Sequence, residues 1–295
     1  NIGDESILRT LVSSLREHIP DCSLTVLSHN PASTREKYGV EAVDRMSPMA
    51  ILRAVKKCDM LISGGGSLLQ DVTSSKSLHY YLSIIRCAEF FHKKVFIYSQ
   101  GIGPIDRPGN RRAAAAALKK ADGIVVRDER SAALLEEIGI ARDKVVITAD
   151  PVIRMKKPDG DVGAEILQKA GVSLGGRLTV GWAIRERDTD SRFVKELLRS
   201  IRMMKDKYNA QSVLIPFHYE EDGEVCRHIA AQLPDDTAVC LNEKFLSEDM
   251  LSIIGNMDLL VGVRLHSLIY AAIMGVPLIG ISYDPKCTAF LNSVG

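Results

Sequence analysis

The sequence lacks the features that mark membrane-spanning, disulfide-stabilised and metal-binding proteins. No apolar run approaches the roughly 20 residues that a helix needs to span a bilayer. The six cysteines are scattered, without a Cys-x-x-Cys pair or a Cys/His spacing typical of a metal site. We therefore expect no structural disulfides and no metal, and we interpret the cysteines as small core residues in a reducing cytosol.

An excess of charge of one sign is missing as well. The chain has 38 Lys and Arg against 37 Asp and Glu, which leaves a net charge of +1. This balance gives no bulk attraction to nucleic acid or to an anionic membrane, although a local basic pocket is still possible.

No signal peptide is visible, and a helix is predicted from the first residues with no strand before it. We therefore expect that residues are missing upstream.

The length of 295 residues favours two domains, because one compact core rarely grows this large. The contents of 46% hydrophobic and 25% charged residues are typical of globular proteins. The stretch 150–162, "DPVIRMKKPDGDV", has two prolines and no periodicity, so the boundary is predicted there. We expect an N-terminal domain over 1–155 and a C-terminal domain over 165–295, whose C-terminal end is incomplete.

Apolar strands alternate with helices in both halves of the chain. In the first half, strands are predicted at 23–28, 59–66, 122–129 and 144–150, and the stretch 93–104 is predicted to be a strand that leads into a Gly/Pro turn. In the second half, they are predicted at 177–186, 212–218, 238–242 and 257–263, and a further strand opens after Pro277. Continuous apolar strands separated by helices indicate parallel sheets covered on both faces. The predicted fold is α/β, with two doubly wound Rossmann-like domains and an interdomain cleft. Ligands of such sheets bind beyond the carboxyl ends of the strands.

Glycines and polar residues follow two predicted strands of the first half. Three glycines after a buried strand permit positive φ values and close approach of a ligand, and the next helix start offers N–H groups to an anion. A tight turn explains the glycines equally well, and neither a GxGxxG nor a Walker pattern is present. The candidate ligand-binding residues here are Gly64, Gly65, Gly66, Ser67, Gln70, Asp71, Gln100 and Gly101.

Two charged residues of the first half have both a structural and a catalytic interpretation. Arg127 ends an apolar strand and either pairs with Asp128 or projects into the cleft, where a guanidinium holds a carboxylate or phosphate by two hydrogen bonds. Asp4 lies at a helix start and is either an N-cap or a general base on a substrate hydroxyl.

The strongest cluster follows the strand at 257–263. Arg264 and His266 come directly after this strand, and Lys286 follows the next one. Two cations and a titratable imidazole suit a phosphorylated carboxylate. Leu265 and Ser267 add the backbone and hydroxyl of the helix start. In "PFHYEED", His218 is a candidate for binding sugar hydroxyls, although a solvated helix start is the preferred interpretation there.

Six segments in this order resemble the polysaccharide pyruvyl transferase family, and in particular its bacterial cell-surface-anchoring members. They are "NIGDE", "ISGGGSLLQD", "YSQGIGP", "VVRDERS", "PFHYEED" and "VGVRLHSLIYAAIMGVPLIGISYDPK". The resemblance implies a GT-B-like architecture and phosphoenolpyruvate as the donor, without a further cofactor. It also implies an N-acetylmannosamine acceptor in a lipid-linked precursor of a secondary cell-wall polymer, which receives a 4,6-ketal. Surface-layer homology domains would recognise the product.

The hypothesis that follows places the loops of the N-terminal domain and His218 on the acceptor side. It also assigns roles to the charged residues at the strand ends. Arg264 and the helix start at Leu265 hold the donor, and His266 protonates its methylene carbon. Asp4 is the candidate base, and Arg127 and Lys286 stabilise the carboxylate or the leaving phosphate. The enzyme would work in the cytoplasm at the inner face of the plasma membrane and contact it through the acceptor lipid.

Two other functions stay open at this point. A GT-B nucleotide-sugar glycosyltransferase would want a ribose-binding carboxylate, for which Glu248 or Asp249 is a candidate. A non-catalytic glycan-binding protein would not need His266.

Overall fold

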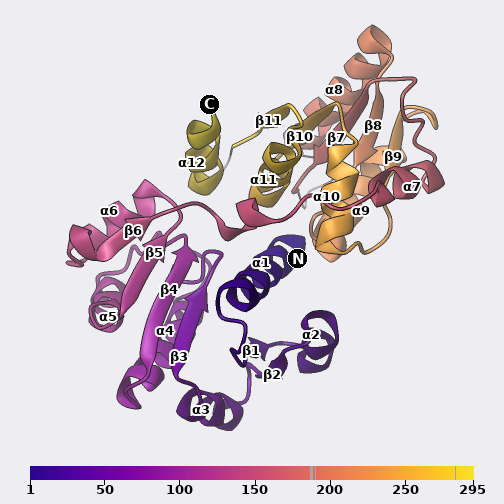
Figure 1. Ribbon diagram of the computed structural model, residues 1–295. Helices are drawn as coiled ribbons and strands as arrows, with labels where there is room; N and C mark the ends of the chain where they lie inside the picture. Colours follow the sequence, from indigo (N-terminus) through magenta and orange to yellow (C-terminus); the bar gives the residue numbers. More distant parts are fainter. Residues whose placement is uncertain (187–188, 190, 283) are drawn as a thin grey trace. The chain divides into compact units, whose positions relative to one another are not determined.

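The chain forms two compact units in the computed structural model, which describes residues 1–186, 189, 191–282 and 284–295 (Figure 1). The N-terminal unit comprises Ile7–Pro151. The C-terminal unit comprises Val152–Gly295 together with Asn1–Ser6. The helix α1 (Ile2–His18) therefore has its first turn in the C-terminal unit and its remainder in the N-terminal unit.

The main sheet of the N-terminal unit is parallel and has the strand order β3-β4-β5-β6. Its strands are β3 (Met60–Gly64), β4 (Lys94–Gln100), β5 (Gly123–Val126) and β6 (Val145–Ile147). The helices between them are α4 (Ser75–Phe90), α5 (Pro108–Leu118) and α6 (Glu129–Glu137), and η1 (Arg142–Lys144) precedes β6. Aliphatic side chains of strands and helices, such as Ile97 and Leu82, form one core.

A second, two-stranded parallel sheet pairs β1 (Thr25–Ser28) with β2 (Glu41–Asp44). Between them lies α2 (Pro31–Tyr38), and α3 (Pro48–Lys57) follows. The sequence prediction missed both α2 and β2, because α2 is polar and β2 has only four residues. The local signals of α2 are nevertheless present: Asn30 caps it, Pro31 is in its first turn and Gly39 ends it in the left-handed conformation.

The sheet of the C-terminal unit is parallel and has the order β11-β10-β7-β8-β9. Its strands are β7 (Thr179–Ala183), β8 (Gln211–Leu214), β9 (Ala238–Cys240), β10 (Leu259–Gly262) and β11 (Leu278–Gly280). The first three strands run outward from β7 to one edge, and the last two run outward on its other side. The strand order thus reverses between β7 and β10, which is where doubly wound sheets bind their ligands.

The helices of the C-terminal unit alternate with these strands along the chain, and a helix follows the last strand. They are α7 (Val162–Lys169), α8 (Arg192–Tyr208), α9 (Tyr219–Ala230), α10 (Ser247–Gly255), α11 (Leu265–Met274) and α12 (Pro285–Val294), with η2 (Pro151–Arg154) before them. The core contains Val180, Trp182 and Ile201. The helix predicted near 222–232 begins earlier, at Tyr219, because the side chain of His218 caps it.

The predicted alternation of strands and helices and the parallel sheets are confirmed in both units. No helix within the described residues is both long enough and apolar enough to cross a membrane.

Candidate functional site

The candidate site of the C-terminal unit begins where β10 ends, at the reversal of strand order. Val263 donates its backbone N–H to the carbonyl of Ala183 at 2.8 Å, which holds the end of β10 against the end of β7. Arg264 is the N-cap residue of α11, and its side chain makes no capping hydrogen bond. The N–H groups of the first turn of α11 are therefore not capped by a side chain at this sheet edge, where an anion is favoured by the helix dipole.

His266 lies half-buried in the first turn of α11 and packs against the start of the chain. A Cβ atom added to Gly3 would lie 2.1 Å from Nδ1 of His266, so only glycine fits beside the ring. Two further contacts hold the start of the chain, one to α11 and one to the residue before the N-cap of α9. The hydroxyls of Ser6 and Tyr270 share a hydrogen bond, and the amide of Ile2 donates to the carbonyl of Phe217 at 3.3 Å. The segments "NIGDE" and "RLHS", far apart in sequence, thus form one site.

Asp4 is exposed in the first turn of α1, within the same unit as His266. The N-cap interpretation of Asp4 is wrong, because Asn1 Oδ1 accepts the N–H of Gly3 at 3.0 Å and Asp4 already lies inside the helix. Its role as a base stays a prediction.

Arg264 forms an ion pair with a buried carboxylate of α9. Its Nε and Nη2 atoms donate to Asp222 at 3.2 and 2.5 Å, and Asp222 is 1% exposed. Glu221 approaches Nη2 at 3.5 Å. His218 accepts the amide of Glu221 at Nδ1, at 3.3 Å, and so caps α9. The preferred interpretation of this segment as a solvated helix start is therefore wrong for Asp222.

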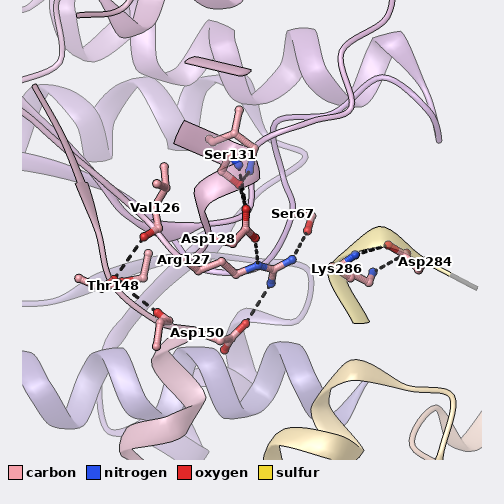
Figure 2. Close-up of polar contacts among 12 residues, drawn as sticks. Ser67, Val126, Arg127, Asp128, Ser131, Thr148, Asp150, Asp284 and Lys286 are labelled. Atoms are coloured by element: carbon pink, nitrogen blue, oxygen red, sulfur yellow. Dashed lines mark hydrogen bonds and ion pairs between the residues drawn. The ribbon is translucent and has the colours of Figure 1, made fainter. Parts of the chain in front are cut away.

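Lys286 and Ser267 make local contacts. Nζ of Lys286 lies 3.2 Å from the carboxylate of Asp284, which also accepts the Lys286 amide as the N-cap of α12 (Figure 2). The buried hydroxyl of Ser267 donates to the carbonyl of Arg264 at 2.6 Å and so tightens the first turn of α11. Tyr283 of the "YDPK" segment lies outside the described residues.

In the N-terminal unit, the glycine-rich loop after β3 is joined to the loop after β4. Gly65 and Gly66 have φ values of +61° and +67°, which side chains other than glycine rarely adopt. Gly65 N donates to the carbonyl of Tyr98, and Gly101 N donates to that of Gly66, both at 2.8 Å. The predicted turn with unusual φ values is therefore present after Gly64.

Arg127 is buried in a polar network at the end of β5 (Figure 2). Its Nη1 donates to Asp150 and its Nη2 to the hydroxyl of Ser67, both at 2.9 Å, while Nε lies 3.5 Å from Asp128. The guanidinium also lies so close to Gly101 that an added Cβ would be 2.6 Å from Nη2. The pairing with Asp128 is present, but Asp150 is the nearer partner. The catalytic role of Arg127 stays a prediction.

The two glutamines predicted for the acceptor side have partners in β3 and in the loop that follows it. Gln100 is fully buried and donates to the hydroxyl of Ser63 at 2.8 Å. Gln70 exchanges two hydrogen bonds with Thr73, one to its hydroxyl and one from its amide, both at 3.0 Å. Gln100 therefore joins the ends of β4 and β3, and Gln70 orders the loop after β3.

Asp71 connects the glycine-rich loop to the start of α5. Its carboxylate accepts the amides of Asp106 and Arg107 and the side-chain amide of Asn110, at 2.9, 3.1 and 2.8 Å. Burial raises the pKa of this carboxyl, but the three hydrogen bonds outweigh it and leave the pKa below the ordinary value of an aspartic acid. Asp71 is therefore ionised at neutral pH and stabilises the loop.

Within the described residues, no group of three or more His, Cys, Asp or Glu side chains could hold a metal ion. The model of one protein family, polysaccharide pyruvyl transferase, matches residues 1–285.

The chain belongs to the polysaccharide pyruvyl transferase family. It is an enzyme, a transferase with a pyruvate donor and a polysaccharide acceptor. The matched residues include the strand-end groups of both units and stop one residue before Lys286. Among curated proteins, it is similar to the amylovoran biosynthesis protein AmsJ of Erwinia amylovora, with 22% identity over all of this chain and 83% of that protein.

Solved structures similar to this polysaccharide pyruvyl transferase have a GT-B-type fold. The UDP-GlcNAc 2-epimerase of Methanocaldococcus jannaschii matches with a TM-score of 0.70 at 12% identity, over 97% of this chain and 83% of that one. S. aureus MnaA, in its co-structure with UDP, matches with 0.66 at 12%, over 99% and 80%. Anabaena HepE in complex with UDP-glucose matches with 0.61 at 11%, over 93% and 76%. These likenesses establish the fold alone.

Three residues of the site were not assigned a role from the sequence. Asp222 was placed among solvated acids, although its spacing of four residues from His218 was a signal, since it accepts the His218 amide at 2.8 Å. Gly3 and Tyr270 had no signal of their own, because their role depends on contacts between the two ends of the chain.

Proposed function

We propose that this transferase moves pyruvate from phosphoenolpyruvate to an N-acetylmannosamine residue of a lipid-linked secondary cell-wall polymer precursor, forming a 4,6-ketal and releasing phosphate. The observation that carries the proposal is the placement of Arg264 and His266 at the uncapped start of α11, beside the reversal of strand order. A cation, a proton donor and a helix N-terminus at one point suit a phosphorylated carboxylate.

The proposed reaction begins with a proton transfer. His266 gives a proton to the methylene carbon of phosphoenolpyruvate, which becomes a methyl group and leaves C2 electrophilic. A sugar hydroxyl attacks C2, forms a C–O bond and loses its proton, for which Asp4 is the proposed acceptor. The bond between C2 and the phosphate oxygen then breaks, the departing phosphate takes the proton that Asp4 had accepted, and the second hydroxyl closes the ketal. The proton of the second hydroxyl returns to His266 and restores its protonated form. The proposed reaction needs no cofactor beyond phosphoenolpyruvate as the co-substrate.

Positive groups support the departure of phosphate. Arg264 and the N–H groups of the first turn of α11 are proposed to hold the anionic donor, and Lys286 is proposed to stabilise the charge that develops on the leaving phosphate. A lipid-linked acceptor would bring the enzyme to the inner face of the plasma membrane.

Phosphate release from phosphoenolpyruvate, measured with a synthetic lipid-linked disaccharide acceptor, tests this function. We expect release by the unsubstituted chain and a loss of roughly 10²–10⁴-fold for His266→Ala, because general acid catalysis contributes about that much. His29→Ala, at an exposed histidine, is the control and should match the unsubstituted chain. Near-normal turnover by His266→Ala would show that His266 is not the general acid.

The same assay separates the proposal from nucleotide-sugar glycosyl transfer. Consumption of a UDP-sugar, without phosphate release from phosphoenolpyruvate, would favour a glycosyltransferase. The ribose-binding carboxylates that such an enzyme would want have other contacts here. Asp249 accepts the amide of Leu246 at 3.3 Å, and Glu248 accepts the hydroxyl of Ser247 at 2.9 Å.

A further inference from the structure

We propose that Asp222 is the positioning residue that fixes the guanidinium of Arg264 for the donor. The inference rests on the proposed function, because it takes Arg264 to be the cation that meets the anionic donor. Asp222 is not itself a catalytic residue here, since it acts through Arg264.

The carboxylate of Asp222 is held in a fixed position at the start of α9. It lies in the first turn of α9, the helix that follows β8, and is 1% exposed. One oxygen, Oδ2, accepts the amide of His218 at 2.8 Å, so the side chain is fixed to the start of its own helix. β8 pairs with β7, and β7 pairs with β10, so Asp222 reaches Arg264 from two strands away.

The geometry of the ion pair leaves one edge of the guanidinium for a ligand. Asp222 accepts from Nε and Nη2, which form one edge of the planar group. Nη1 makes no hydrogen bond to any described residue. Because the guanidinium is planar, fixing the Nε–Nη2 edge also fixes the direction of the Nη1 hydrogens. A preoriented Arg264 can then meet a carboxylate or phosphate without first being ordered.

Burial explains why a carboxylate is needed for this. The side chain of Arg264 is 16% exposed, and a guanidinium so far removed from water requires a charged partner. Glu221 is a weaker partner, at 3.5 Å and with 37% of its side chain exposed. Without Asp222, we expect Arg264 to turn toward Glu221 and solvent and to lose its orientation, while its charge stays.

The first measurement is the binding of phosphoenolpyruvate to the full chain by calorimetry, together with steady-state kinetics. We expect Asp222→Asn to raise Kd and KM about tenfold or more, with a much smaller change in kcat. A tenfold change corresponds to about 1.4 kcal/mol. Glu224→Gln removes an exposed acid from the same helix and is the matched control. Binding by Asp222→Asn equal to that of the control would overturn the proposal.

The second measurement separates positioning from a merely structural role. Arg264→Ala should bind phosphoenolpyruvate weakly, and added guanidinium should restore binding because Asp222 still holds the ion in place. The double variant Arg264→Ala/Asp222→Asn has no unpaired buried charge at this position and should fold, yet guanidinium should not restore its binding. Equal restoration in both variants would overturn the positioning role.

The failure of this proposal is distinct from the failure of the proposed function. Binding that depends on Asp222 without any phosphate release would refute pyruvyl transfer from this donor and leave the positioning role intact. Normal phosphate release with no effect of Asp222→Asn on Kd or KM would refute the positioning role and leave pyruvyl transfer intact. A chain that does not bind phosphoenolpyruvate at all would refute both.

Discussion

Arg127 and Arg264, which lie just after β5 and β10, each contact a carboxylate of their own unit. Arg127 meets Asp150 at 2.9 Å, and Arg264 meets Asp222 through two of its nitrogen atoms. Removal of one partner from such a pair leaves a buried charge without compensation, which is strongly destabilising. Alanine variants of these arginines therefore change both stability and ligand binding, and they are best interpreted beside variants of the carboxylate.

Gly3 provides a residue-scale prediction about His266. Gly3→Ala places a methyl group where the imidazole now lies, so the ring must move away from its present position. Since a displacement of about 1 Å costs roughly 10²-fold in rate, we expect kcat to fall by about that factor while the thermal unfolding temperature changes little. Gly176→Ala, at a position where an added Cβ meets nothing within 4 Å, is the control. An unchanged kcat would mean that the ring position does not matter.

Sequence reasoning found the residues of the site that stand at strand ends, because the apolar run before them locates the end of each strand. Arg264 and His266 follow such a run directly. Partners that come from other secondary-structure elements could not be predicted from the sequence. Asp222 meets Arg264 across 42 residues, and the choice between a solvated and a buried acid depends on that contact alone.

At the scale of elements, the loops after β3 and β4 behave as one layer. Backbone hydrogen bonds join Gly65 to Tyr98 and Gly101 to Gly66, and the carboxylate of Asp71 fastens this layer to α5. The apolar strands and the amphipathic helices around the layer could be predicted from their periodicity. The polar network could not, because loop residues have no periodicity and their partners depend on the turn geometry.

Asp71→Asn tests this layer through pH dependence. At neutral pH we expect the variant to lose about 2 kcal/mol of unfolding free energy, since hydrogen bonds to a charged group contribute about 1.5–3 kcal/mol. The folded-state pKa of Asp71 lies below that of an aspartic acid in the unfolded chain, so its contribution is fully present above the unfolded-state pKa. It is lost as the pH falls further, and the difference between variant and unsubstituted chain should shrink there.

Denaturant unfolding curves at neutral and strongly acidic pH give this difference. Asp21→Asn, at an exposed aspartate of the same unit, controls for the loss of a negative charge. A difference that does not change with pH would assign the effect of Asp71→Asn to shape rather than to charge.

At the scale of the whole molecule, the charge balance bears on how the enzyme would meet a lipid-linked acceptor. With a net charge of +1, the chain has little general attraction to anionic lipid. We expect flotation assays to show no more binding to anionic vesicles than to neutral ones, and to show binding when the lipid-linked acceptor is included. Strong binding to anionic vesicles without acceptor would contradict recruitment by the substrate.

The grouping of Asn1–Ser6 with the C-terminal unit has a consequence for biosynthesis. Ser6 and Tyr270 are separated by 264 positions, and Gly3 and His266 by nearly as many. Contacts of such long sequence separation form late, because the intervening chain must first be ordered. On the ribosome, the residues around His266 emerge long after Gly3, once the whole N-terminal unit has been synthesised. An unfinished chain can therefore fold its N-terminal unit while the surroundings of His266 have not yet been assembled.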